Sequence, residues 1–193
     1  MAPKRQRLSV HERHYQLVRI AVEMIATRSW DLVTMADIAA AAHVSKPLLY
    51  HYFSTKTDLY VAAVRAAADD LREATTPAAT LSPQARLLHA LQAHVDWVEA
   101  NAHGYRAILQ GGLSAHPEVQ AIVEASRAEV VRRIAETMGT EHPHPALRIA
   151  IRGWVGFLEG ACLDWLSAQD VAKADLVRLL AASLPGALRA ADG

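Results

Sequence analysis

A cluster of side chains able to bind a polyanion lies between residues 46 and 52, directly after Ser45. The segment reads Lys-Pro-Leu-Leu-Tyr-His-Tyr, so a cation, an imidazole and two phenols occur within seven positions. Such side chains donate hydrogen bonds to phosphate oxygens and to base edges. Ser45 can also cap a helix that begins here, and the free backbone N–H groups of its first turn attract anions. The pattern favours contact with nucleic acid through Lys46, Pro47, Tyr50, His51 and Tyr52.

The ten histidines raise metal binding as a second kind of chemistry. His89 and His94 are five residues apart, which on a helix separates them by about 140°, too far for a shared site. His142 and His144 flank Pro143 in a segment that we expect to be an irregular turn. The sequence shows no glycine-rich phosphate loop, nucleophile elbow or paired carboxylates. We therefore expect no enzyme activity, no metal and no cofactor.

Helix caps place the anion-binding cluster on the second of two short helices. Thr34 and Asp37 form a capping box that opens a helix through about residue 41, and Ser45 opens the next helix, with Pro47 in its first turn. Two short helices joined by a tight turn between residues 34 and 53 are the pattern of a helix-turn-helix. The residues spaced to fill the wedge between them are Ile38, Ala39, Val44, Leu49 and Phe53.

Helices are expected along the rest of the chain, and no strand. Capping boxes at residues 9–12 and 55–58 begin two helices, and Ser82-Pro83 begins another that ends near residue 101. The later helices are predicted over residues 105–113, 117–138, 145–167 and 171–184, with Gly104, Gly139 and Pro185-Gly186 as stop signals. The predicted fold class is all-α. An N-terminal three-helix helix-turn-helix domain covers residues 1–55, and a C-terminal helical bundle for ligand binding and dimerisation covers residues 56–193.

Residues 34–59 closely resemble the N-terminal motif of the TetR (tetracycline repressor) family. The family pattern falls on Thr34, Ile38-Ala39, Val44-Ser45, Leu49-Tyr50, Tyr52-Phe53, Lys56 and Asp58-Leu59. Two positions depart from it: His43 stands where glycine usually forms the turn, and Pro47 stands where a small residue often faces DNA. The resemblance implies phosphate contacts for Thr34, Ser45, Tyr50, Tyr52 and Lys56, and a groove-facing position for Lys46, Pro47 and His51.

A structural interpretation is open for several of these side chains. Tyr50 and Tyr52 could be packing aromatics, and Lys56 could be an ordinary surface lysine. The charge distribution favours the DNA interpretation, because residues 1–60 hold eight basic and five acidic residues (+3) and the remainder holds twelve and fifteen (−3). The basic arm at residues 4–7 is a further candidate for phosphate or minor-groove contacts.

A stripe of glycines marks the helix predicted over residues 145–167. Gly153, Gly156 and Gly160 share one face of it, and each glycine inside a helix costs about 1 kcal/mol relative to alanine. Close approach of another helix is the simplest compensation, and the resemblance implies that the last two helices form a four-helix dimer interface. We predict a homodimer that is held by Gly153, Gly156, Gly160, Leu176, Leu179 and Leu180.

The resemblance also implies a pocket for an effector within the helical bundle. The residues expected to line it are Trp97, Tyr105, Ile108, Leu109, Leu113, Trp154, Phe157 and Trp165. Aromatic residues at helical spacing are more often core than ligand wall, and this alternative stays open for each of them. The apolar character of the set favours a small, largely apolar effector.

These features predict a DNA-binding transcriptional regulator, a repressor that the effector releases from a palindromic operator. The alternative is a DNA-binding architectural protein without an effector. The expected partners of the regulator are double-stranded operator DNA, a second copy of the chain and the effector. No membrane is expected, because no run of eighteen apolar residues occurs. The single cysteine, Cys162, excludes an internal disulfide framework and fits a reducing compartment, so we expect the protein in the cytoplasm.

Overall fold

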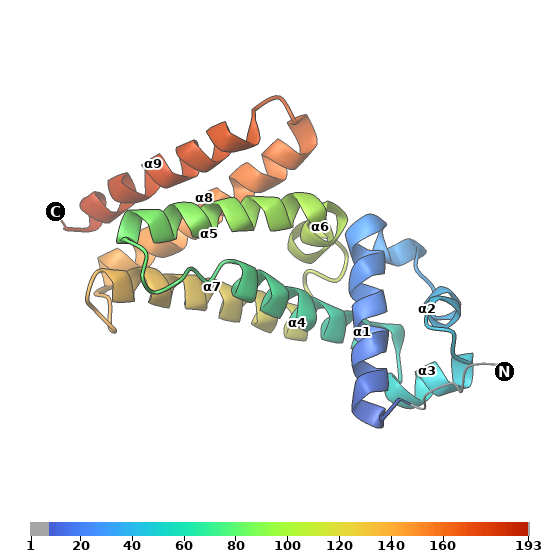
Figure 1. Ribbon diagram of the computed structural model, residues 1–193. Helices are drawn as coiled ribbons and strands as arrows, with labels where there is room; N and C mark the ends of the chain where they lie inside the picture. The colour runs from blue at the N-terminus through green and yellow to red at the C-terminus, as the bar shows by residue number, and fades with distance from the viewer. Residues whose placement is uncertain (1–7, 193) are drawn as a thin grey trace.

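The first helices stand across one end of a longer bundle that the remaining helices form (Figure 1). The structure is a computed structural model that describes residues 8–192, and it contains no strand in that range. Its elements in chain order are α1 (Val10–Thr27), the short 3₁₀ helix η1 (Trp30–Leu32), α2 (Met35–Ala41), α3 (Lys46–Tyr52), α4 (Lys56–Ala74), α5 (Pro83–Ala100), α6 (Ala102–Gln110), α7 (Pro117–Thr137), α8 (Pro145–Ala168) and α9 (Lys173–Asp192).

The N-terminal core extends past the predicted domain boundary at residue 56. Leu17, Ala21 and Ile25 of α1 are buried in one hydrophobic cluster with residues of α2 and α3, and the first half of α4 adds Leu59 and Val64 to it. Nearer the end of α4, the side chain of Asp70 forms an ion pair with Arg19 of α1. Helix α4 therefore belongs to the N-terminal unit at its start and to the bundle at its end.

The core of the bundle is built by α5, α6, α8 and α9, and two tryptophans tie its last two helices together. The indole N–H of Trp154 donates to the backbone oxygen of Leu180 at 3.3 Å and to the hydroxyl of Ser183 at 3.0 Å. The indole N–H of Trp165 donates to the backbone oxygen of Val171 at 2.8 Å. Both large side chains are thus buried with their polar atoms satisfied, as a stable core requires.

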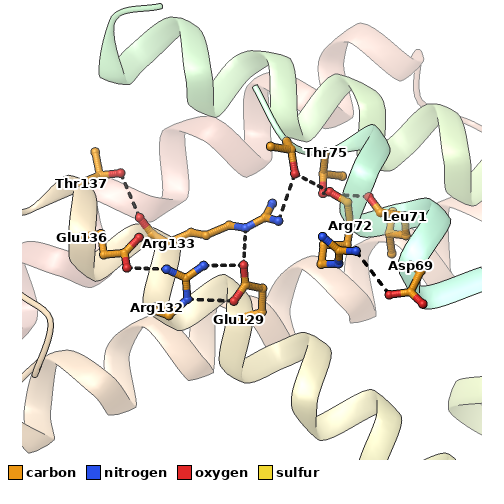
Figure 2. A network of polar contacts seen from close by, with 10 residues as sticks. Asp69, Leu71, Arg72, Thr75, Glu129, Arg132, Arg133, Glu136 and Thr137 are labelled. Atoms are coloured by element: carbon orange, nitrogen blue, oxygen red, sulfur yellow. Dashed lines mark hydrogen bonds and ion pairs between the residues drawn. The ribbon is translucent and has the colours of Figure 1, made fainter. Parts of the chain in front are cut away.

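A polar network fastens the end of α4 to α7 (Figure 2). The guanidinium of Arg133 donates to the Thr76 hydroxyl at 3.0 Å and to the Glu129 carboxylate at 2.8 Å. Arg132 also donates two hydrogen bonds to Glu129, at 2.6 and 2.8 Å. Hydrogen bonds from Arg132, reinforced by Arg133, lower the pKa of Glu129 to about 2. The carboxylate therefore stays charged at neutral pH and holds both guanidinium groups in place.

Two of the predicted stop signals are wrong. Gly104 lies inside α6, where a Cβ atom would come within 3.0 Å of the Ile25 side chain, so its role is close contact with α1. Pro185 lies inside α9, which continues to residue 192. The turn beyond it packs the half-buried side chains of Leu188 and Ala191 against the cluster around Ile151, and this packing offsets the one backbone hydrogen bond that proline removes.

No helix within residues 8–192 is both long and apolar enough to cross a membrane. Over the same range, no three His, Cys, Asp or Glu side chains come together in a way that could hold a metal ion.

Candidate nucleic-acid interface

Local hydrogen bonds hold the two short helices of the helix-turn-helix in place. The Thr34 hydroxyl accepts from the backbone N–H of Asp37 at 3.1 Å, and the Asp37 carboxylate accepts from the backbone N–H of Thr34 at 2.9 Å. Hydrogen bonds from the backbone N–H and the hydroxyl of Thr34 lower the pKa of Asp37 below its usual value. The capping box at the start of α2 is therefore complete and charged.

The turn between α2 and α3 contains a residue in the left-handed conformation. His43 has φ 53°, and the backbone N–H of Val44 donates to the oxygen of Ala39 at 2.9 Å. A glycine would adopt this conformation without strain, and the histidine adopts it with its side chain exposed.

Helix α3 turns one narrow face to the protein and the rest to solvent. Leu49 is its only fully buried residue, and Phe53, which follows the helix, packs beside it. Ser45 accepts from the backbone N–H of Leu48 at 3.3 Å, which caps the helix. Lys46, Pro47, Tyr50 and His51 are all exposed, on the side away from the core. Ile38, Ala39 and Leu49 are buried and Val44 is half-buried, so the predicted wedge is present.

Two of the residues expected to meet DNA also make contacts within the subunit. Tyr52 is half-buried and packs against the N-terminal core. Lys56 donates its ammonium to the backbone oxygen of Trp30 at 2.7 Å and lies 5.0 Å from the centroid of the Trp30 ring. Its positive charge thus fastens the start of α4 to η1. The sequence motif does not predict this contact, because Trp30 lies 26 residues before Lys56 and accepts through its backbone oxygen, which every residue has.

Two other residues expected to contact phosphates are exposed at the surface. Thr34 and Ser45 are exposed at the first turns of α2 and α3, where free backbone N–H groups lie beside them. The basic arm at residues 4–7 lies outside the described residues.

The glycine stripe of α8 lies at the surface of the subunit. Gly153, Gly156 and Gly160 are exposed, and a Cβ atom added at any of them would meet nothing within 4 Å. Two large apolar side chains of α8, Ile149 and Phe157, are exposed too, at 60% and 43%. In α9, Leu179 is exposed at 54%. We call the surface formed by these six residues the α8–α9 face.

The predicted dimer interface is corrected at Leu176 and Leu180, which are buried within the subunit. Leu176 is 4% exposed and Leu180 fully buried, both in the subunit's own core. Helix α9 turns these residues towards α5 and α8, so they are not available to a second subunit.

The residues expected to line a pocket divide into three groups. Trp97, Tyr105, Leu109, Trp154 and Trp165 belong to the core of the bundle. Ile108 and Leu113 pack against the N-terminal core instead, and Phe157 lies on the α8–α9 face. Trp154 and Trp165 are structural, since their indole groups join α8 to α9.

Two hollows lie where the bundle meets the N-terminal unit. An open groove of about 280 Å³ is lined from both parts, by Trp30 and Tyr60 on one side and by Arg106, Gln110 and Leu113 on the other. A second hollow of about 10 Å³ has an almost wholly apolar wall that includes Ile25, Ala67, Trp97 and Ile108. It has room for a water molecule at most.

One pair of buried polar side chains was missed by reasoning from the sequence. The Nε2 atom of His94 in α5 and the hydroxyl of Tyr105 in α6 are buried without a hydrogen-bond partner among the described residues. Their rings lie edge to face, with centroids 6.2 Å apart. Helical spacing alone could not bring them together, because they come from different helices.

Comparison with known proteins gives two family matches. Residues 17–63 match the family described as bacterial regulatory proteins, tetR family, and residues 83–184 match the tetracyclin repressor-like C-terminal domain.

Individual proteins with similar sequences and structures are known as well. The HTH-type transcriptional activator FasR of Mycolicibacterium smegmatis is 34% identical over 167 residues, which are 83% of this chain and 75% of the relative. The HTH-type transcriptional regulator BetI of Cronobacter sakazakii is 27% identical over 162 residues, 81% of this chain and 79% of the relative. The crystal structure of a tetR-family transcriptional regulator from Streptomyces coelicolor has a TM-score of 0.89 at 30% identity and covers 95% of this chain and 83% of that one.

Proposed function

The chain belongs to the tetR family of bacterial regulatory proteins and is a DNA-binding transcriptional regulator, and we propose that it binds a palindromic operator as a homodimer. In this proposal it acts as a repressor, and a small, largely apolar effector that binds in the helical bundle releases it from DNA.

The outer face of α3 is the observation that carries the proposal. Lys46, Pro47, Tyr50 and His51 are exposed together on it, while buried Leu49 and half-buried Tyr52 hold the helix to the core. A helix exposed in this way fits the major groove, where lysine and histidine donate to base edges and the proline ring meets a thymine methyl group. Thr34, Ser45 and Tyr50 are proposed to contact the flanking phosphates.

The α8–α9 face supports a dimer. It combines three glycines that allow close approach of a second backbone with Ile149, Phe157 and Leu179, which are exposed in the single subunit. Exposed apolar side chains beside a flat glycine surface mark a protein interface. Dimerisation through this face is proposed to set the two α3 helices about one DNA turn apart.

Helix α4 is the element that we propose transmits effector binding to the DNA-binding unit. Its first residue, Lys56, is bound to Trp30 of that unit. At the other end Thr76, two residues after the helix, donates to the backbone oxygen of Arg72 in the last turn and accepts from Arg133 of α7. A displacement of α4 changes the separation of the two α3 helices and weakens operator binding. Coupling free energies of this kind are about 1–3 kcal/mol, or about 5–150-fold in affinity.

The experiment that tests operator binding is selection from a pool of random duplex DNA at moderate salt, followed by sequencing of the retained fragments. The expected result is a palindrome whose half-sites lie about 10 base pairs apart. Retention of sequences with no common motif would contradict the proposal. The same selection with Lys46→Met is the control, because loss of one proposed base contact should relax the preference in each half-site.

Release by an effector separates a ligand-responsive regulator from a DNA-binding architectural protein. The recovered operator is titrated with the protein in the presence and absence of apolar compounds, and the thermal stability of the protein is measured with the same compounds. A compound that raises the melting temperature and lowers operator affinity supports the effector mechanism. If no compound that binds the protein changes its operator affinity, the result supports the architectural alternative.

Activation of transcription is the second candidate, and the name of the FasR relative, a transcriptional activator, favours it. The two candidates differ in what the bound dimer does at the promoter. A reporter gene behind the recovered operator separates them: deletion of the regulator raises expression if the chain represses and lowers expression if it activates.

A further inference from the structure

The open groove of about 280 Å³ lies where the N-terminal unit meets α6, and none of its lining residues belongs to the core of the bundle. One wall comes from η1 and α4 and includes Asp31 and Tyr60. The other wall comes from α6 and the connection after it. His103, Arg106 and Gln110 of α6 are three or four residues apart, so they share the face of the helix that lines the groove. The groove is therefore a polar space separate from the interior of the bundle.

Opposite charges line the two walls without a partner. The carboxylate of Asp31 is exposed and the guanidinium of Arg106 is half-buried, and neither forms a hydrogen bond or an ion pair with any residue between 8 and 192. The groove keeps the two charges too far apart to pair with each other. By contrast, the half-buried Arg127 and Arg133 of α7 each bind a glutamate, at 2.7 and 2.8 Å. Both charges of the groove are thus available to groups of the opposite sign.

The wall formed by η1 and α4 suits an ammonium group. Tyr60 lines the groove although it is only 1% exposed, and its hydroxyl forms no hydrogen bond within the described residues. Burial is the main cause that raises the pKa of Tyr60 to about 12, and the charge of the nearby Asp31 carboxylate adds to it. The phenol oxygen is therefore uncharged at neutral pH and lies near that carboxylate. Both groups accept hydrogen bonds, and an ammonium group donates three.

The wall formed by α6 suits a carboxylate. A guanidinium such as that of Arg106 binds a carboxylate through two parallel hydrogen bonds, and the side chains of His103 and Gln110 on the same face have further N–H donors. Ala107 and Leu113 add apolar surface to this wall. A volume of about 280 Å³ is near the lower limit for small-molecule sites, so the groove fits a small ligand.

We propose that this groove is a second ligand site and that its ligand is a small zwitterion with an apolar body, either a free amino acid or a short peptide. The ammonium group of the ligand binds Asp31 and the Tyr60 hydroxyl, and its carboxylate binds Arg106. A ligand with a single charge leaves one wall unpaired, so both charges are needed for tight binding. The site lies outside the bundle core, and the inference does not depend on the effector proposed for the bundle.

L-Leucine and L-leucyl-L-leucine are the probes for the two sources, and each is compared with its N-acetylated and its amidated form. Acetylation removes the ammonium charge and amidation removes the carboxylate charge, while the apolar part stays the same. Binding to the full-length protein is measured by calorimetry at pH 7.5. At least one zwitterion should bind, and at least about ten times more tightly than either of its blocked forms. Binding of leucine identifies an amino acid site, and binding of the dipeptide alone identifies a peptide site. No binding of either zwitterion, or equal affinity for a blocked form, would overturn the inference.

Two substitutions test which wall binds which charge. Asp31→Asn should weaken binding of the zwitterion about tenfold and remove the preference over its acetylated form, because the ammonium group loses its counter-ion. Arg106→Gln should weaken binding to a similar degree and remove the preference over the amidated form. Arg65→Gln is the matched control: Arg65 of α4 is exposed and does not line the groove, so both preferences should persist. Variants that bind more weakly but keep both preferences would contradict the assignment.

Pairing of Asp31 with Arg106 across the groove in solution would give a different result. Each single substitution would then lower the melting temperature as much as the double substitution does, and neither zwitterion would bind, which would overturn the inference. The proposed site instead predicts little change in the melting temperature of the ligand-free variants. Tyr60→Phe removes only the phenol oxygen, so it should weaken binding of the zwitterion about fivefold and leave binding of the acetylated form unchanged.

Discussion

At the scale of single residues, His43 has an unfavourable backbone conformation. It holds the turn of the helix-turn-helix with φ 53°, a conformation that costs a non-glycine residue about 1–2 kcal/mol. His43→Gly should raise the free energy of unfolding by about 0.5–1 kcal/mol, after allowance for the extra freedom of glycine in the unfolded chain. Urea denaturation followed by circular dichroism measures it. Ala42→Gly, at φ −79°, is the control and should lower stability; a destabilised His43→Gly would show that the imidazole itself supports the turn.

His94 makes stability depend on pH. Its pKa is about 4 in the folded protein and about 6.5 in the unfolded chain, so the unfolded chain binds more protons between these values. Stability should therefore fall as the pH is lowered from about 6.5 to about 4, by up to about 1.4 kcal/mol per pH unit from this residue. His94→Phe should flatten that part of the profile, whereas His89→Phe, on the exposed side of the same helix, should not. Parallel profiles for all three proteins would contradict the assignment.

Tyr50 tests the DNA-reading surface. It is 45% exposed on α3 and makes no hydrogen bond within the described residues, so Tyr50→Ala should leave folding and dimerisation intact. Loss of one phosphate contact should weaken operator binding by roughly tenfold, as measured by fluorescence anisotropy of labelled DNA. Leu88→Ala, at an exposed position of α5 in the bundle, is the control. Unchanged affinity of Tyr50→Ala would remove α3 from the interface.

The positions of these residues were predictable to different degrees. Exposure of Lys46, Tyr50 and His51 followed from local signals, because a capped helix with one buried leucine has only one way to face the core. The half-burial of Tyr52 and the contact of Lys56 with Trp30 depend on packing between distant segments. The same holds for His94 and Tyr105, which become neighbours only once α5 and α6 are packed.

At the scale of elements, α4 is the helix whose two ends belong to different parts of the molecule. The ammonium of Lys56 holds the first end at the Trp30 backbone oxygen, and a hydrogen bond of this charged kind contributes about 1.5–3 kcal/mol. Lys56→Met, which keeps most of the aliphatic stem, should therefore lower the free energy of unfolding by about 1–2 kcal/mol. Lys46→Met is the matched variant, since Lys46 is exposed and should affect only operator affinity. The opposite result, a stable Lys56→Met that loses DNA binding, would return Lys56 to the list of phosphate contacts.

Helix starts were predicted better than helix ends. Side-chain caps at Ser9, Thr34, Ser45, Thr55 and Ser82 fixed five starts, because a cap is a local interaction within three residues. Helix ends predicted from glycine and proline were wrong at two places where tertiary packing determines the structure. Gly104 serves the contact between α6 and α1, and Pro185 is carried inside α9 by the packing of the turn that follows.

At the scale of the whole molecule, the α8–α9 face is the surface through which we propose that two copies of the chain associate. Gly156 is open to solvent within one subunit, so Gly156→Leu should not disturb the subunit's fold and should strengthen α8 as a helix by about 0.5–1 kcal/mol. A leucine there should block the close approach of a second subunit. Sedimentation at low protein concentration should give a monomer, and operator affinity should fall with it.

Gly112→Leu provides the control for that experiment. A Cβ atom at Gly112 also meets nothing within 4 Å, but the residue lies in the α6–α7 connection, where it lines the open groove beside Trp30 and Tyr60. It should leave the dimer intact. A dimeric Gly156→Leu would show that the two subunits associate through another surface.

The single buried anchor of α3 also bears on how such proteins diverge. Because Leu49, Tyr52 and the adjoining Phe53 fix the helix, the side chains at positions 46, 47, 50 and 51 can be exchanged without repacking the core. A duplicated gene can therefore acquire a new operator through a few surface substitutions while its bundle stays unchanged. If the bundle binds the proposed effector, descendants of one ancestor would answer the same compound at different promoters, and DNA specificity and ligand specificity would evolve separately within one fold.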